Sequence, residues 1–79
     1  MGREEIFAKV QAILVDQLEV SAEDVTMEAN FQEDLDADSL DLVEVIMELE
    51  DQFDLKISDE EAEQIGTVGA AVDFIEKRV

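Results

Sequence analysis

One serine lies inside a densely acidic stretch of the chain, DLDADSLDLVE at residues 34–44, and it is the side chain best placed for chemistry. Ser39 directly precedes apolar residues at helical spacing, so either Asp38 or Ser39 can accept a free backbone N–H as the N-cap of a helix. Acidic residues in the first turn suit the positive end of the helix dipole. The simplest role of Ser39 is that of a cap, and any chemistry at its hydroxyl needs further support.

The residue inventory limits what the chain can catalyse by itself. It contains no His and no Cys, so the usual general base, the thiol nucleophile and the common zinc ligands are missing. A Ser–Lys pair would require a lysine, and none lies near Ser39 in the sequence. The 23 acidic residues are too many for all of them to be catalytic. We therefore interpret the chain as a protein that is acted upon, not as an enzyme, and expect no metal site.

Alternating acids at Asp34, Asp36 and Asp38 are similar to the opening of an EF-hand calcium loop. That loop requires glycine at its sixth position and a bidentate glutamate at its twelfth. Counted from Asp34, these positions are Ser39 and Val45. The sequence therefore predicts no EF-hand, although loose divalent binding by clustered acids would relieve their mutual repulsion.

The formal net charge of −18 on 79 residues restricts the choice of partner. No basic residue lies between Lys9 and Lys56, and 15 acids fall in that interval. Nucleic acid is disfavoured because both surfaces would be anionic. Proteins with Lys/Arg patches are favoured, since opposite fields speed encounter and orient the partners.

Helical spacing and capping signals predict an all-α, four-helix bundle with one short third helix and a long first loop. The apolar stripe Ile6, Phe7, Val10, Ile13, Leu14 and Leu18 marks a helix over 4–18, and a second helix is expected over 39–53. Ser58 and Glu61 form a capping-box pattern for a short helix that ends near Ile65, with Gly66 as its stop. Thr67 is expected to cap a last helix with its apolar side at Val68, Ala71, Val72, Ile75 and Val79.

The connection over 19–37 is too regularly apolar to be a plain solvent loop. We expect its apolar residues to pack onto the bundle and residues 21–24 to form one capped turn. These apolar residues are Val20, Val25, Met27, Phe31 and Leu35.

The second helix carries two apolar faces. Leu42, Val45, Ile46, Leu49 and Phe53 fall within one arc, which is the expected core face. A smaller strip of Leu40, Val43 and Met47 lies on roughly the opposite side, with acids around it. A helix that faces one core needs only one apolar side, so the second strip is interpreted as a docking surface with an acidic rim.

Over its whole length the chain resembles the acyl carrier protein family of bacterial type II fatty-acid synthesis. The matching motifs are FQEDL at 31–35, DSLD at 38–41, VE at 43–44, EDQF at 50–53, ISDEEA at 57–62 and TV at 67–68. Two positions depart from the family pattern: Asp36 stands where many members have glycine, and Ser58 where proline is usual. Asp tolerates a positive φ at position 36 less well than glycine does, and Ser58 can still cap a helix.

The resemblance implies that residues 1–79 form a single acyl carrier domain, made as an apo protein. A phosphopantetheinyl transferase would attach 4′-phosphopantetheine from coenzyme A to Ser39, and the arm would carry growing fatty acyl chains as thioesters between synthesis enzymes. The implied partner-recognition residues are Asp38, Leu40, Asp41, Val43, Glu44, Met47 and Glu48. The implied acyl pocket is formed by Val45, Ile46, Leu49, Phe53, Ile57, Ala62, Ile65 and Ala71.

Two alternatives remain open from the sequence. A carrier for polyketide, peptide or D-alanyl chemistry would share the fold and the serine, and an unmodified acidic interaction bundle would share the charge. We expect a monomer, with the cytoplasm as the default compartment. No membrane insertion is expected, because no apolar run approaches the roughly 18 residues that cross a bilayer.

Overall fold

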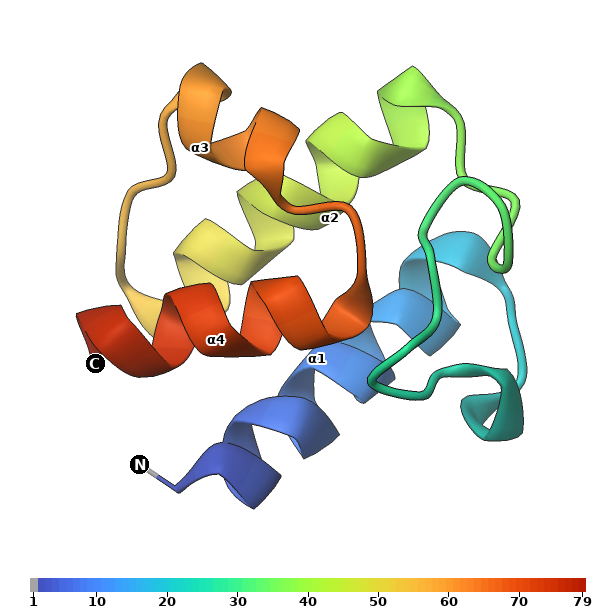
Figure 1. Cartoon of the computed structure of the whole chain (residues 1–79), viewed down its shortest axis with the longest axis horizontal. Coiled ribbons are helices and arrows are strands. Elements are labelled where there is room, and N and C mark those ends of the chain that lie inside the picture. Colours follow the sequence, from blue (N-terminus) through green and yellow to red (C-terminus); the bar gives the residue numbers. More distant parts are fainter. Residues whose placement is uncertain (1) are drawn as a thin grey trace.

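Helices form where the apolar periodicity predicts them, and side-chain caps mark the starts of three of the four. The computed structural model describes residues 2–79, and four α-helices enclose one core (Figure 1). The elements in chain order are α1 (Arg3–Leu18), the 3₁₀ turn η1 (Ala22–Asp24), α2 (Ser39–Phe53), α3 (Asp59–Gln64) and α4 (Val68–Arg78). The predicted all-α fold with a short third helix is confirmed. Within the described residues, no helix is long and apolar enough to cross a membrane.

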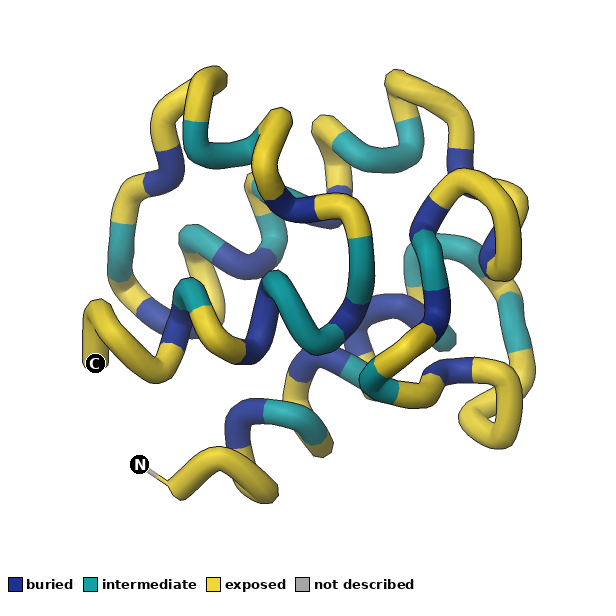
Figure 2. The backbone as a smooth tube through the Cα atoms, viewed as in Figure 1, coloured by how far each residue is buried: buried dark blue, intermediate teal, exposed yellow. Residues whose placement is uncertain are grey.

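The core is made where the apolar sides of α1, α2 and α4 meet (Figure 2). α1 contributes four buried residues of its predicted stripe, while Phe7 and Leu18 are partly buried and pack against the cluster. α2 contributes Val45, Leu49 and Phe53. One prediction is wrong: Val79 is 51% exposed, because α4 ends at Arg78 and its last turn lies beyond the edge of the core.

Three of the four helix starts are capped by a side chain. Asp38 caps α2, Ser58 caps α3 in the predicted box with Glu61, and Thr67 caps α4 by accepting the Ala70 N–H at 3.1 Å. The turn at 22–24 forms, but the Ser21 side chain makes no capping hydrogen bond, so the expectation of a capped turn is wrong there. Residues 21–24 are all exposed, so water can satisfy the free N–H groups at the start of this turn in place of a side-chain cap.

Gly66 does not end α3 in the way that was expected. Its φ is not positive, so it is not a left-handed C-cap. The helix stops because Ile65, in extended conformation at φ −89° and ψ 92°, places its side chain in the core. The carbonyl of Gly66 then accepts the Phe31 N–H at 3.1 Å.

The long connection after α1 is fixed to the junction between α3 and α4 by backbone hydrogen bonds. Phe31 donates to Gly66, Val68 donates to Ala29 at 3.0 Å, and Gly69 donates to Met27 at 2.8 Å. Asn30 and Thr67 form an isolated antiparallel bridge in the middle of this set. We call residues 27–31 and 66–69 with these bonds the loop ladder.

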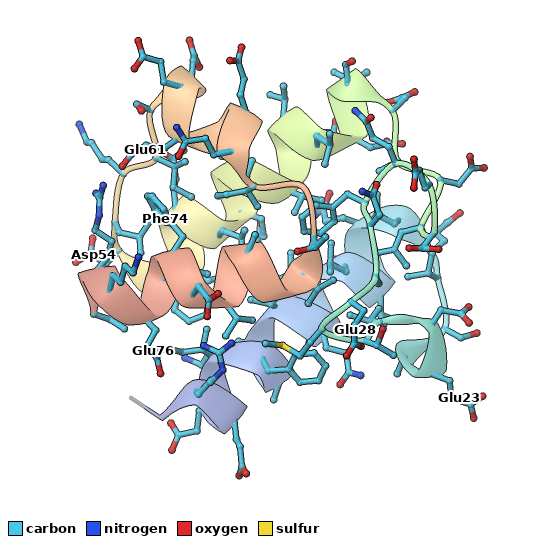
Figure 3. All side chains as sticks on the ribbon, viewed as in Figure 1. Glu23, Glu28, Asp54, Glu61, Phe74 and Glu76 are labelled. Carbon is cyan, nitrogen blue, oxygen red and sulfur yellow. The ribbon has the colours of Figure 1, made fainter. Side chains whose placement is uncertain are left out.

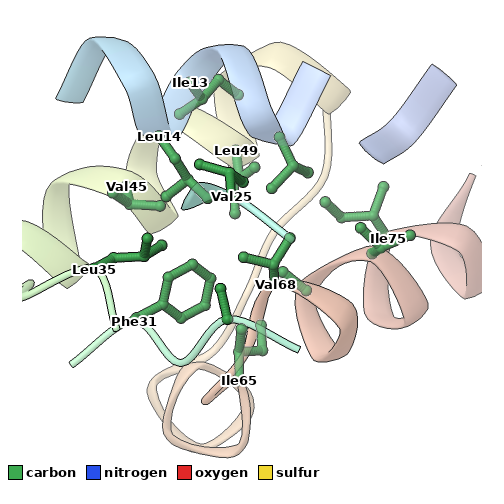
Figure 4. Close-up of a cluster of buried hydrophobic side chains, with 14 of the residues drawn as sticks. Ile13, Leu14, Val25, Phe31, Leu35, Val45, Leu49, Ile65, Val68 and Ile75 are labelled. Carbon is green, nitrogen blue, oxygen red and sulfur yellow. The ribbon is translucent and has the colours of Figure 1, made fainter. Parts of the chain in front are cut away.

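Side chains of the connection complete the core, as the sequence predicts. Val25, Phe31 and Leu35 are almost fully buried, and Val20 and Met27 pack against the cluster. The Phe31 ring lies among Leu35, Ile65 and Val68 in the buried cluster (Figure 4). The connection therefore contributes its apolar side chains to the core, while most of its polar residues are exposed.

α3 is attached differently from the other helices. None of its six residues is buried, and the buried side chains that hold it are Ile57 before it and Ile65 after it. The carboxylate of Glu50 accepts the Ile57 N–H at 2.8 Å, which ties the start of this segment to α2. Six residues are too few for a helix to be stable by itself, so α3 depends on these flanking contacts.

The close approach of Gly69 to Met27 in the loop ladder predicts that a methyl group at position 69 destabilises the fold. A Cβ at Gly69 would lie 2.8 Å from the main-chain oxygen of Met27, which is bonded within the ladder and cannot move freely. We expect Gly69→Ala to lower the free energy of unfolding by about 1–3 kcal/mol, measured by urea denaturation.

The matched control is Gly66→Ala, because a Cβ there meets no atom within 4 Å. This variant should unfold within about 0.5 kcal/mol of the parent chain. Equal effects of the two substitutions would contradict the account of the ladder.

Candidate functional site

Ser39 is the first residue of α2 and is exposed. The cap is its neighbour: Asp38 Oδ1 accepts the Asp41 N–H at 2.9 Å, and Asp41 Oδ2 accepts the Asp38 N–H at 3.3 Å. This capping box decides between the two candidate caps in favour of Asp38. The Ser39 hydroxyl is therefore not needed to start the helix and is presented to solvent at its first turn.

The turn that leads to Ser39 is anchored to the core by buried residues. Leu35 and Ala37 are buried, and Ala37 donates its N–H to the Phe31 carbonyl at 2.8 Å. Between them Asp36 adopts the left-handed conformation at φ 57°. The position where many members of the resembled family have glycine thus requires a positive φ, and an aspartate fills it here.

The alternating acids of this turn are used in backbone hydrogen bonds. Asp34 Oδ2 accepts the Asn30 N–H at 2.7 Å, and Asp38 belongs to the capping box. Among residues 2–79, no group of three or more acidic side chains gathers in a way that could hold a metal ion. Two of the three carboxylates of the EF-hand-like pattern thus have local roles.

A cleft of about 680 Å³ opens beside Ser39, between α2, α3 and the end of the long connection. Its apolar lining comes from Phe31, Leu42, Ile46, Ile57, Ala62 and Ile65. Polar residues stand around it, among them Ser39 itself, Glu50 and Glu63. We call this space the α2–α3 cleft. A hydroxyl at the edge of an apolar cleft can carry a group whose far end lies inside the cleft.

The residues expected to form an acyl pocket divide into two sets. Ile46, Ile57, Ala62 and Ile65 line the α2–α3 cleft. Val45, Leu49, Phe53 and Ala71 are buried in the core behind it and do not line it. All the lining residues lie between Asn30 and Gly66, so α4 does not reach the cleft.

Several lining residues were not among the expected pocket residues. Phe31, Asn30 and Gln32 come from the long connection, and Gly66 comes from the other side of the loop ladder. Spacing on a helix cannot reveal them, because they reach the cleft only through the path of the connection. The one signal in the sequence is Phe31, a large apolar residue shortly before the acidic turn.

The expected recognition residues all lie on the accessible side of α2. Leu40, Val43 and Met47 are 66%, 54% and 60% exposed, which confirms that the second apolar strip faces away from the core. Asp38 and Glu44 are exposed, and Asp41 and Glu48 are half-buried. Val43 and Met47 also line the α2–α3 cleft, so this strip continues into its mouth.

An exposed serine at a helix start beside an apolar cleft is the arrangement that a carrier domain needs, and comparison with known proteins identifies the chain as one. The family model described as a phosphopantetheine attachment site matches residues 8–75. An acyl carrier protein of Rubrobacter xylanophilus is 60% identical over 75 residues, which cover 95% of this chain and 93% of that protein. A solved structure of acyl carrier protein from Enterococcus faecalis covers 100% of both chains at 47% identity, with a TM-score of 0.84.

The chain belongs to the acyl carrier protein family. These findings confirm the family that the motifs indicate, its character as a non-catalytic acyl carrier and 4′-phosphopantetheine as the cofactor. Membership also implies interaction with synthesis enzymes and with a phosphopantetheinyl transferase.

The positive φ of Asp36 predicts which substitutions the turn before Ser39 accepts. Glycine adopts φ 57° without a Cβ clash, whereas alanine is strained there. Asp36→Gly and Asp36→Ala remove the same negative charge. The difference between their stabilities therefore reports the backbone strain at position 36 and not the loss of charge. We expect the glycine variant to be more stable than the alanine variant by about 1 kcal/mol in thermal or urea unfolding. Equal stabilities would mean that the turn relaxes in solution.

Proposed function

We propose that Ser39 is the attachment site of 4′-phosphopantetheine, and that the protein carries growing fatty acyl chains between the enzymes of fatty-acid synthesis. The observation that supports this proposal is the exposed Ser39 hydroxyl, released from capping by Asp38 and placed at the edge of an apolar cleft. Residues 1–79 would act as one carrier domain, as a monomer in the cytoplasm.

The first turn of α2 suits a phosphodiester on Ser39. The capping box uses the backbone N–H groups of Asp38 and Asp41, which leaves those of Ser39 and Leu40 at the N-terminus for a phosphate oxygen. Asp38 and Asp41 would repel the phosphate, but the high dielectric of water keeps that repulsion small between groups near the surface. The arm can therefore be attached without rebuilding the helix start.

The cofactor supplies what the sequence lacks. The chain has no cysteine, and the bound arm provides the thiol on which an acyl group travels as a thioester. The protein contributes shelter, because Ile46, Ile57, Ala62 and Ile65 offer an apolar lining beside Ser39. An acyl group would reach the deeper set of expected pocket residues only if the core loosens around it. These residues are Val45, Leu49, Phe53 and Ala71.

The partners dock, in this proposal, on the exposed strip of α2. Leu40, Val43 and Met47 give a small apolar centre, and acids surround it. The acids are Asp38, Asp41, Glu44 and Glu48. Basic patches on the transferase and on the synthesis enzymes would pair with them, and such steering favours the fast, short-lived contacts that a shuttle needs.

The attachment site is tested by intact mass. Incubated with coenzyme A and a promiscuous phosphopantetheinyl transferase, the protein should gain one phosphopantetheine, and Ser39→Ala should gain none. Ser21→Ala is the matched control, because Ser21 is exposed and its side chain caps nothing. An unchanged mass of the parent protein, or modification of Ser39→Ala, would remove the assignment.

The docking surface is tested by charge and polarity changes on α2. Val43→Asp and Glu44→Lys should each lower the kcat/KM of a partner enzyme roughly tenfold, because they disturb the apolar centre and the acidic rim. The far-ultraviolet circular dichroism should not change, since both side chains are exposed. Glu23→Lys, an equal charge change in η1, is the control and should be close to the parent. Loss of helical signal in the α2 variants would mean that these residues are structural.

A further inference from the structure

The side chain of Arg78 joins three separate segments of the chain. It projects from the last turn of α4, and its guanidinium pairs with the Glu61 carboxylate of α3. Its Nη1 also donates to the carbonyl of Lys56, in the segment between α2 and α3, at 3.4 Å. The guanidinium lies over the Phe74 ring, with Cζ 4.6 Å from the centroid; Figure 3 labels Phe74 and Glu61.

Glu61, which pairs with Arg78, also forms the capping box at the start of α3 with Ser58. Glu61 Oε1 accepts the Ser58 N–H at 3.0 Å, while Ser58 Oγ accepts the Glu61 N–H at 3.2 Å. The other carboxylate oxygen, Oε2, pairs with Arg78. The hydrogen bond from the Ser58 N–H and the charge of Arg78 lower the pKa of Glu61, which keeps its carboxylate ionised.

α3 is also one wall of the α2–α3 cleft, through Asp59, Ala62 and Glu63. Because none of its residues is buried, the position of this wall depends on contacts at its ends and on Glu61. Glu61 itself does not line the cleft, so Arg78 holds the wall without entering the cleft.

We propose that Arg78 is a positioning residue that holds α3 closed over the α2–α3 cleft, and so sets how often the cleft opens for acyl cargo. The part of this inference that concerns cargo rests on the acyl-carrying function proposed above. An exposed ion pair is weak, but α3 has few other attachments, so a small change in free energy shifts its open fraction severalfold.

The first test needs no cargo, because it measures hydrogen exchange in the apo protein. In α3 the Ala62 N–H donates to the Ser58 carbonyl at 2.9 Å, and at its end the Ile65 N–H donates to Ala62 at 3.1 Å. In Arg78→Gln these two amides should exchange about twofold to fivefold faster than in the parent, the range that one exposed ion pair supports. Amides in the middle of α1 should not change.

The matched control is Arg3→Gln, which loses the same charge. Arg3 bridges α1 to α4 through Asp73 at 2.5 Å and Glu76 at 3.2 Å, and it is as exposed as Arg78. Its loss should leave the two α3 amides unchanged. Arg78→Lys keeps the charge and should restore part of the protection. Unchanged α3 exchange in Arg78→Gln, or faster exchange throughout the molecule, would overturn the inference.

The second test adds cargo and separates this inference from the function on which it rests. Decanoyl and acetyl thioesters of the holo protein are compared for cleavage by hydroxylamine. In the parent, the decanoyl form should be protected relative to the acetyl form, and Arg78→Gln should reduce that protection about twofold to fivefold. If the decanoyl form of the parent is not protected, the proposal that the cleft shelters acyl cargo is wrong, whereas the effect of Arg78 on α3 is judged by hydrogen exchange. Full protection in Arg78→Gln, despite faster α3 exchange, would contradict the control of the cleft by Arg78.

Discussion

The structure depends on the backbone hydrogen bonds of the loop ladder. They fix the segment around Ala29 and Phe31 to the junction that starts α4, and a nearly buried Phe31 completes the core from that segment. Buried backbone groups need partners, and here two irregular segments satisfy each other. The Phe31 carbonyl also accepts the Ala37 N–H. Because Phe31 belongs to the ladder, this hydrogen bond links the ladder to the turn in front of Ser39.

The helices and their caps could be predicted from the sequence because both are local. The apolar periods of α1 and α2 and the box at Ser58 specify their own geometry within a few residues. The errors at Ser21 and Gly66 are of the same kind, because in both a residue type typical of a helix end was taken to form that end. The Ser21 side chain makes no capping hydrogen bond. At the end of α3 the burial of Ile65, and not a left-handed Gly66, stops the helix.

The exposed strip of α2 and the position of Ser39 at the start of that helix were also predictable, since both can be read from one helix. The role proposed for Ser39 comes from the family resemblance and not from the helix pattern. The cleft was predicted only in part. Ile46, Ala62 and their neighbours are on helices or next to them, but Phe31 and Gly66 reach the cleft through a connection whose path no local pattern determines. The family resemblance implied Ala71 as a pocket residue, but Ala71 is buried in the core and does not line the cleft. The contact of Arg78 with α3 was not predicted either, because it joins positions 17 residues apart across an irregular segment.

Under the docking proposal, the capping box at the start of α2 limits which positions can be changed to redesign partner choice. Asp38 and Asp41 complete each other's backbone hydrogen bonds, so new side chains there alter the helix start on which Ser39 stands. The capping box does not involve four exposed residues of α2, which are Leu40, Val43, Glu44 and Met47. An orthogonal carrier, one that serves a chosen enzyme and ignores the native set, is best engineered at those four positions, with both aspartates retained.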